Sequence, residues 1–521
     1  MSDQKIWIPR SLGDIILFNS LIIEVNEYAL PVCFKFFNAP CIAWSIRNKR
    51  VLFTQVSYKC TYDVKQKIVS RFVLTGTQWD KLIFKYIPEF IQSAWLYIVS
   101  LAIGLQYETF SGDDFSHVVF RGIDFRGSTF VEVELHDADL RYSDFQTADF
   151  LNTDLSNANF GCAYLEHSEF HDNHLHETDF KNAYLRKAMF HDVSMDHVTF
   201  ENACLMSAYF IETSLSYVNF NGADLRNSEF SIVQFNEGDE GNTFKGADLS
   251  GAIFEGLFSR CADFSNSKLL GINMNDSTMD DSDFRDTDFT NASLQRSSLT
   301  NSNLTRANLT GSDLQHSNCF QADFSNAVLC GANLEGSYLH TTLFNNCLLA
   351  GADFKESDCT NASFTGADLS DANFTDVDLT QTIFTGATLI GANFTGSILM
   401  EADIKGVDLM QTILTGACLS GLDLRDMDFT GHDLTDTDFT GANLRGANFT
   451  GANLTRARFT RANLRDVNFT GADLTRAKFK YADMEGANMK DAYIRAADFS
   501  EVDLSGVNIE NAHNPKSAIY Q

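Results

Sequence analysis

The chain has 521 residues, of which 44% are hydrophobic, and a formal net charge of −30 at pH 7. This length and apolar content allow a large buried core and would ordinarily indicate two to four domains. The acidic balance argues against DNA as a partner, because DNA is itself a polyanion.

Residues 1–104 differ in composition from the rest of the chain. They contain all four tryptophans and four of the five prolines: Trp7, Trp44, Trp79, Trp95, Pro9, Pro31, Pro40 and Pro88. No proline lies between 89 and 514, so the backbone there can form a ladder that lacks no donor. We therefore place a boundary near residue 105 and predict that 1–104 is a non-repeat domain of mixed or helical structure. Its apolar character suits it to capping whatever follows.

The most apolar stretch of this first segment runs from Ile91 to Leu105. It is too short for a transmembrane helix, which needs about 20 residues. We interpret it as a packed helix that covers the start of the next domain, and membrane contact through the first 104 residues is the alternative. The first ten residues mix polar and apolar types and do not resemble a cleavable signal.

A period of five governs the next 400 residues. Every fifth residue from Phe110 to Phe235 is Phe, Leu or Met, which gives 26 consecutive centres, and the register resumes from Phe244 to Ile509 with 54 further positions. The residue two before each centre is most often Ala, Ser, Thr or Val, and the residue just before it is most often Asp or Asn. Five matches neither the helical period nor the strand period. It indicates a short extended piece followed by a corner, with the centre and the small residue two before it facing inward.

Typical units read GADLS, GANFT and RANLR. This pattern resembles the pentapeptide-repeat family, whose motif is A(D/N)LXX. The resemblance implies an all-β solenoid in which four repeats close one coil of a right-handed quadrilateral β-helix, here of about 20 coils. The phenylalanine centres fit four sides, because they recur on alternate centres and shift by one face near residue 415. Stacked rings in successive coils are favourable, which explains why each column persists.

Two interruptions divide the repeats. Phe235 to Phe244 spans nine residues instead of ten, through a charged, glycine-containing loop that we expect to kink or offset the axis. Ser259 occupies a centre beside Phe258, which predicts a local bulge. The expected organisation is therefore a first repeat block at 105–235, a loop at 236–243, a second block at 244–510 and a tail at 511–521.

Charge is unevenly distributed along the chain. Residues 105–240 carry 7 basic and 25 acidic residues, whereas residues 445–500 carry 10 basic and 6 acidic ones. With a 20-residue coil, Arg445 stacks over Arg465, Arg456 over Arg476 and Arg458 over Lys478, with Arg461 nearby. Like charges so close repel unless a partner neutralises them. We predict that these seven residues form a partner-binding basic patch, and the alternative is a solvated surface.

We predict no catalytic, cofactor-binding or metal site. The chain has no phosphate-binding glycine loop, no HExxH and no Ca²⁺ loop, and the first histidine is His117, so residues 1–104 lack Cys–His and Ser–His chemistry. The 11 cysteines show no CxxC pair and are interpreted as reduced. One stretch is rich in histidine: His167, His171, His174, His176, His191 and His197. These histidines could form a metal site or a pH sensor, but we interpret them as exposed surface residues.

The sequence thus predicts a non-enzymatic protein-interaction scaffold with unidentified protein partners. Two other interpretations remain open: a bacterial effector secreted into a host cell, where it acts on proteins or membranes, and an acidic rod that mimics DNA and binds a topoisomerase. We expect a cytoplasmic location, with secretion into a host cell as the alternative. The oligomeric state cannot be predicted.

Overall fold

The computed structural model describes residues 105–235 and 241–520, and the backbone of four strands before residue 64. These strands are β1 (Pro31–Phe34), β2 (Ile42–Arg47), β3 (Arg50–Gln55) and β4 (Tyr58–Asp63). They form an antiparallel sheet in sequence order. The run predicted to form a packed helix lies outside the described residues apart from Leu105. No helix in the described part of the chain is long and apolar enough to cross a membrane.

The chain consists of two compact units, residues 1–164 and 165–521. The first unit contains, besides the antiparallel sheet, the parallel strands β5 (Thr109–Ser111), β6 (Thr129–Val131) and β7 (Asp149–Leu151). Their register places Phe110 beside Phe130 and Phe130 beside Phe150, 20 residues apart each time. The rings of each pair stack with centroids 4.9 Å apart, which confirms that the centres face inward.

The second unit continues the same construction with two parallel sheets on different sides of the coil. Four strands form one sheet: β8 (Glu169–His171), β10 (Met189–His191), β12 (Tyr209–Ile211) and β14 (Glu229–Ser231). Four form the other: β9 (His174–His176), β11 (Ser194–Asp196), β13 (Ser214–Ser216) and β15 (Gln234–Phe235). Beyond β15 the coils are joined by single-residue bridges, and the described part ends with a short 3-10 helix, η2 (Pro515–Ser517).

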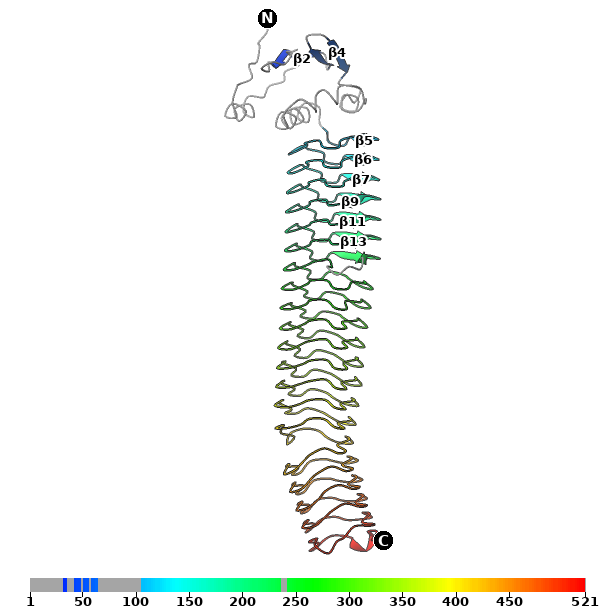
Figure 1. Cartoon of the computed structure of the whole chain (residues 1–521), viewed down its shortest axis with the longest axis vertical. Helices are drawn as coiled ribbons and strands as arrows, with labels where there is room; N and C mark the ends of the chain where they lie inside the picture. Colours follow the sequence, from blue (N-terminus) through cyan, green and yellow to red (C-terminus); the bar gives the residue numbers. More distant parts are fainter. Residues whose placement is uncertain are drawn as a thin grey trace, which may run out of the picture. The chain divides into compact units, whose positions relative to one another are not determined.

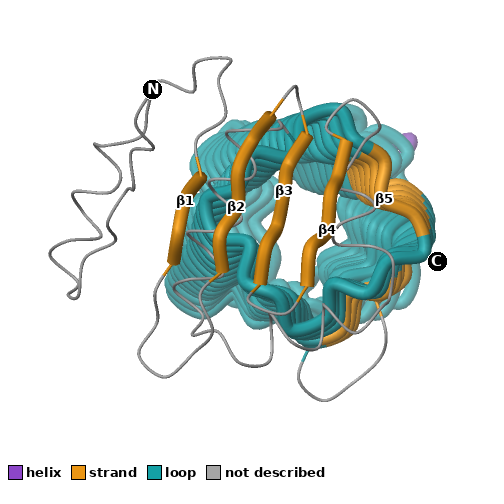
Figure 2. The backbone as a smooth tube through the Cα atoms, turned by 90° about the horizontal axis from the view of Figure 1, so that it is seen from above, coloured by secondary structure: helices purple, strands orange, loops and turns teal. Residues whose placement is uncertain are grey.

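One coil of the second unit contains four pentapeptides. Four consecutive units each pair with the residue 20 positions further on: Ser363 with Ile383, Asp368 with Thr388, Asn373 with Asn393 and Asp378 with Ile398. Four parallel ladders therefore run along the solenoid, and successive coils follow one four-sided outline (Figure 2). The right-handed, four-sided β-solenoid is confirmed; the total of about 20 coils and the capping role of residues 1–104 remain predictions.

Nearly every corner of the described solenoid contains a residue with a positive φ angle, although the corners at Gln411 and Gly506 do not. At one corner with such a residue, the amide of Ala367 donates to the carbonyl of Phe364 at 3.0 Å, and Gly366 between them has φ 69°. A positive φ at the third residue of such a turn suits Gly, Asn or Asp. Even Arg456 adopts φ 63° at this position, so the ladder imposes the corner on residues that do not favour it.

The insertion near residue 240 differs from the sequence-based interpretation. The bridge that should join Asn219 to residue 239 joins it to Thr243, and Phe244 stacks on Phe220 at 4.8 Å. The chain therefore inserts four residues into one coil, where the sequence had indicated one residue too few across two repeats. Asn242 belongs to the coil rather than to the loop, since its side-chain amide accepts from the Val218 amide at 2.8 Å.

The predicted bulge at Ser259 is wrong. Phe258 continues its ladder in register from Gln234 to Thr278, with no extra residue. The large and small side chains of this repeat have changed places. Leu257 fills the inward position normally held by a small residue, and the small Ser259 occupies the centre. Both side chains are buried, so the core volume is conserved without a change in backbone register.

A second discontinuity lies between the coils at 402–414 and 422–434, where the ribbon opens on one side (Figure 1, yellow to orange). In the described chain, three of the four ladders lack a bridge between these coils: Asp403–Asp423, Asp408–Asp428 and Ile413–Asp433. The fourth ladder continues through Cys418. We call this discontinuity the ladder fault.

The fault coincides with three consecutive large side chains in inward positions that mostly hold small residues; Leu257 and Ile272 are isolated large residues at such positions, and the ladder there is intact. Leu422, Met427 and His432 each lie two residues before a centre, in three consecutive pentapeptides. The ring of His432 reaches across the opening, with Nε2 3.1 Å from the carbonyl oxygen of Leu409. In regular coils a hydroxyl takes this role, as when Thr382 donates to the carbonyl of Cys359 at 2.9 Å. Three oversized side chains in one coil thus hold the two coils apart.

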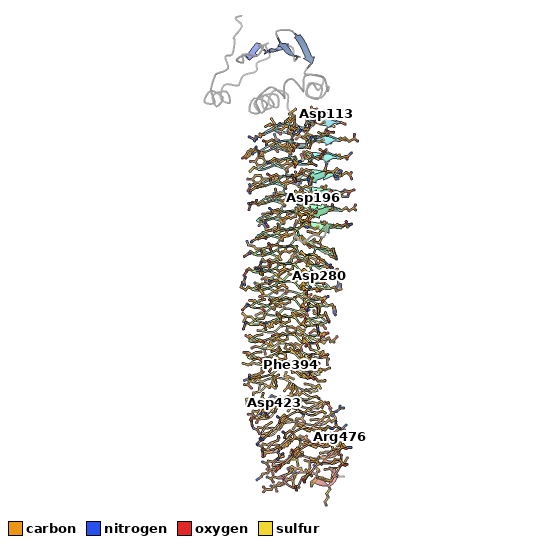
Figure 3. All side chains as sticks on the ribbon, viewed as in Figure 1. Asp113, Asp196, Asp280, Phe394, Asp423 and Arg476 are labelled. Carbon is orange, nitrogen blue, oxygen red and sulfur yellow. The ribbon has the colours of Figure 1, made fainter. Side chains whose placement is uncertain are left out.

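The phenylalanine columns change sides across the fault, as predicted. Phe374 stacks on Phe394 at 5.0 Å before it, and Phe429 stacks on Phe449 at 5.0 Å after it, one side further round the coil. Phe394 and Asp423 mark the two sides of the fault in Figure 3. A coil of Leu and Ile centres lies between the two arrangements, because a ring stacked on a smaller aliphatic side chain would leave voids.

Candidate interaction surface

Two rows of basic side chains lie on one side of two consecutive coils. Arg458 and Lys478 are direct ladder partners, the Arg456 amide donates to Thr475 beside Arg476, and the Arg461 amide donates to the carbonyl of Lys480. The basic face is defined as Arg456, Arg458, Arg461, Arg476, Lys478 and Lys480. Five of these residues were predicted from the 20-residue spacing. Lys480 was missed, although the same spacing places it on this face.

Acidic neighbours pair with the first row of the basic face. Arg456 Nε lies 2.6 Å from a carboxylate oxygen of Asp436, and Arg458 lies 3.7 Å from Asp438. The ion pair with Arg456 lowers the pKa of the Asp436 carboxyl below its ordinary value. These pairs are exposed, so they contribute little to stability. They do reduce the net positive charge of the first row.

The second row has no such neutralisation. Within the described chain, no carboxylate lies within 4 Å of Arg476, Lys478 or Lys480. The nearest acid in the Lys478 ladder is Asp498, whose pKa is lowered first by its hydrogen bonds with Ser500 and then by Lys480 and Lys478. The second row therefore keeps most of its positive charge, at a backbone spacing of about 4.8 Å from the first.

An aromatic ring completes the basic face at one corner. Lys480 Nζ lies 5.1 Å from the centre of the Tyr481 ring, and the Arg461 guanidinium lies 6.0 Å from it. Half of the Tyr481 surface is exposed. Arginine and tyrosine together are the residue types most enriched at the energetic centres of protein interfaces.

Arg445 and Arg465 lie away from the basic face. They occupy a corner separated from Arg461 by one whole side of the coil, as their sequence offset requires. Their charges are also satisfied locally: Arg445 lies 3.6 Å from Asp466, and Arg465 pairs with Asp483 at 3.2 Å and with Glu485. The seven predicted residues are thus divided between two surfaces.

The histidine-rich stretch forms contacts that its sequence spacing only partly suggests. His171 and His191 are ladder partners with ring centres 5.7 Å apart. Three other residues, His176, Asp196 and His197, bring their nitrogen and oxygen atoms within 4.8 Å of one another. The first unit contains a comparable group of His117, His136 and Asp137. No observation tests the sequence-based prediction that the chain has no metal site.

The described cysteines are free thiols. Burial raises the pKa of Cys319 and of Cys359 to about 12, so neither forms a thiolate near neutral pH. Both occupy centres of the repeat and act as small core residues. That the chain has no catalytic activity and binds no cofactor remains a prediction.

Comparison with known families agrees with this geometry. A family model described as pentapeptide repeats (8 copies) matches more than half of the chain, at residues 110–146, 134–172, 163–202, 203–238, 282–318, 307–346, 317–355, 417–456, 452–491 and 472–511. The chain belongs to the pentapeptide-repeat family. Related models, described as a pentapeptide repeat region and pentapeptide repeats (9 copies), match residues 337–413 and 257–298.

Several solved structures are similar to parts of this pentapeptide-repeat chain. HetL, a regulator of heterocyst differentiation from the cyanobacterium Nostoc, is 30% identical over 44% of this chain and 89% of its own, with a TM-score of 0.19. The plasmid-mediated fluoroquinolone resistance protein QnrB1 is 22% identical over 40% and 89%, with a TM-score of 0.26. A thylakoid-lumen protein of Arabidopsis thaliana is 23% identical over 30% and 68%, with a TM-score of 0.12. No curated protein matches the sequence.

Proposed function

We propose that this pentapeptide-repeat protein is a non-enzymatic interaction scaffold and that its basic face binds an acidic segment of a protein partner. The observation that carries the proposal is the second row: Arg476, Lys478 and Lys480 lack an acidic partner in the described chain although the protein has 69 acidic residues. Many other exposed cations of the described solenoid are paired, as Arg296 is with Asp276 and Arg306 with Asp286.

The geometry favours an extended, acidic ligand. The two rows lie on consecutive coils about 4.8 Å apart, so carboxylates along one extended segment can reach both rows. Repulsion between the rows would fall when carboxylates of a partner lie between them. The exposed ring of Tyr481 adds an apolar contact beside the charges.

The other two interpretations, a secreted effector and a DNA mimic, use the acidic surface or residues 1–104 in place of the basic face. The eight free cysteines of the described chain support a reducing compartment and hence the proposed cytoplasmic location. Membrane contact through residues 1–104 falls on residues outside the described structure, apart from the backbone of four strands.

The test measures binding of a fluorescent ten-glutamate peptide to the full chain by anisotropy at low salt. The variant Arg476→Glu/Lys478→Glu should weaken binding at least about tenfold, because it reverses the charge of the unpaired row. Its control is Lys187→Glu/Lys245→Glu, which makes the same charge change at two exposed lysines without an ion pair and should leave binding unchanged.

Affinity should also fall steeply between 20 and 150 mM salt, since the Debye length shortens to about 8 Å. Equal affinity of the two variants, or no binding by the wild-type protein, would overturn the proposal. A capture experiment with the same two variants then separates the three interpretations. Capture of a host protein or of a topoisomerase that persists in the Arg476→Glu/Lys478→Glu variant would favour the acidic-surface alternatives, because that change leaves the acidic surface intact.

A further inference from the structure

We propose that His176, Asp196 and His197 form a binding site for a divalent transition-metal ion of the zinc class. The site lies on the outer surface of β9 and β11, far along the sequence from the basic face. It is independent of the proposed function, because it uses none of the same residues.

The backbone fixes the spacing of these three residues. His176 and Asp196 are direct ladder partners in β9 and β11, so their side chains leave neighbouring coils on the same side. His197 follows Asp196 at a corner with φ 56°, which turns its side chain back toward the carboxylate. The parallel ladders hold both coils, so the site is organised before any ligand arrives.

Both imidazoles contact the same carboxylate. His176 Nδ1 lies 2.9 Å from one oxygen of Asp196, and His197 Nδ1 lies 2.9 Å from the other. Glu177 offers a fourth group, since its carboxylate lies 3.6 Å from His176 Nε2. The ring of Tyr217 stacks on His197 at 4.8 Å and restricts its rotation. A set of two imidazoles and one or two carboxylates is a usual ligand set for Zn²⁺.

The charge of Asp196 supports a cation there. Other exposed aspartates of the solenoid pair with arginine, as Asp224 does with Arg226 and Asp283 with Arg285. Asp196 and Glu177 have no lysine or arginine partner in the described chain, only the imidazoles. Residues 105–240 carry 7 basic and 25 acidic residues, so the surrounding surface also attracts cations.

The ligand types select the class of metal. Ca²⁺ and Mg²⁺ prefer oxygen ligands in sets of six or more, which two imidazoles do not supply. Imidazole suits Zn²⁺, Cu²⁺ and Ni²⁺. The ligand atoms lie within 4.8 Å of one another, and the half-exposed side chains can close by rotation to the bond lengths of about 2.0–2.1 Å that zinc requires.

The test is calorimetric titration of the full chain with Zn²⁺. All proteins carry His117→Ala, His136→Ala and His171→Ala, so that the other described groups of imidazole and carboxylate side chains do not contribute. This parent should bind one equivalent of Zn²⁺. A variant that also carries His176→Ala/His197→Ala should bind Zn²⁺ at least about tenfold more weakly. Loss of only a residue that hydrogen-bonds a metal ligand already lowers metal affinity 10- to 100-fold.

The matched control is His167→Ala/His316→Ala, which removes two exposed histidines at the same kind of corner as His197, with φ 58° and 56°. It should bind as the parent does, and circular dichroism should show all three proteins equally folded. Absence of Zn²⁺ binding by the parent, equal affinity of the His176/His197 variant, or equally tight binding of Ca²⁺ at this site would overturn the proposal.

Discussion

If the large side chains of Leu422, Met427 and His432 cause the ladder fault, replacing them should close it. Replacing Leu422, Met427 and His432 together with alanine gives this coil the small inward residues of its neighbours. The two coils should then close, and the amides of Leu409 and Leu414 should form ladder hydrogen bonds. In the described structure neither amide donates to a backbone carbonyl, whereas the Leu424 amide one coil later donates to Asn443 at 2.8 Å.

The expected free-energy changes determine whether a measurement of global stability could detect the closing of the fault. Each restored bridge supplies two backbone hydrogen bonds, so three bridges supply six, worth about 0.5–1.5 kcal/mol each and about 3–9 kcal/mol together. Removing the buried parts of two large apolar side chains costs about 1.5–3 kcal/mol each, or about 3–6 kcal/mol. The net change in global stability is therefore small, and a melting temperature would not reveal the repair.

Hydrogen exchange of the full chain, followed by mass spectrometry, reports the local effect directly. The peptides that contain Leu409 and Leu414 should exchange at least about tenfold more slowly in the triple variant, since one net hydrogen bond of about 1.4 kcal/mol gives that factor. The control is Ile272→Ala, which removes a large inward side chain where the ladder is intact and should speed exchange around it. Unchanged or faster exchange at Leu409 in the triple variant would refute this account of the fault.

Three further predictions concern the regular coils. Replacing the fully buried centre Leu369 with Asp should destabilise its coils by more than 3 kcal/mol in local exchange, whereas Thr365→Asp at the corner should change them by about 0.5 kcal/mol or less; equal effects would mean that the inward and outward faces are misassigned. Arg226 lowers the pKa of Asp224, so this pair stabilises the fold above pH 3.8, and the benefit is lost as pH falls through the lower folded value. The variant Arg226→Met should therefore be less stable than wild type at pH 6 and equally stable near pH 2. Cys319 should react with a thiol reagent only after denaturation, because burial raises its pKa to about 12; rapid labelling of the native chain would contradict its place in the core.

The repeating part of the fold could be predicted because a period of five fixes which side chains face inward. Leu369 and the other centres up to Phe499 are buried as expected, whereas Leu504 is partly exposed and Ile509 is exposed. The number of sides was only implied by the family resemblance, because a period of five by itself leaves it open. The bulge at Ser259 was predicted wrongly, since the interpretation considered the centre alone and missed its exchange of size with Leu257.

The same limitation applies to the candidate sites. The 20-residue spacing brought Arg458 and Lys478 together correctly, because register partners follow from arithmetic once the coil length is known. It could not show that Arg465 is neutralised by Asp483, since ion pairs across coils depend on side-chain direction as well as register. The contact between His197 and Asp196 was missed for a related reason: it depends on a corner conformation that spacing does not reveal.

The central claim is that two rows of cations bind a partner because successive coils place them on one face. A ten-residue insertion, GADLTGANFT, between Thr470 and Gly471 tests this without changing the basic residues. It should preserve the stacking of Phe469 on a phenylalanine of the next coil, because the rings occupy opposite sides, but it moves the second row to the opposite side of the solenoid.

The measurement is the affinity of the ten-glutamate peptide for this variant and for a control with the same insertion after Glu485, beyond the basic face. The account predicts at least about tenfold weaker binding for the first insertion and unchanged binding for the control, with both proteins folded. Equal affinity of the two proteins would contradict the claim that the coil assembles the site.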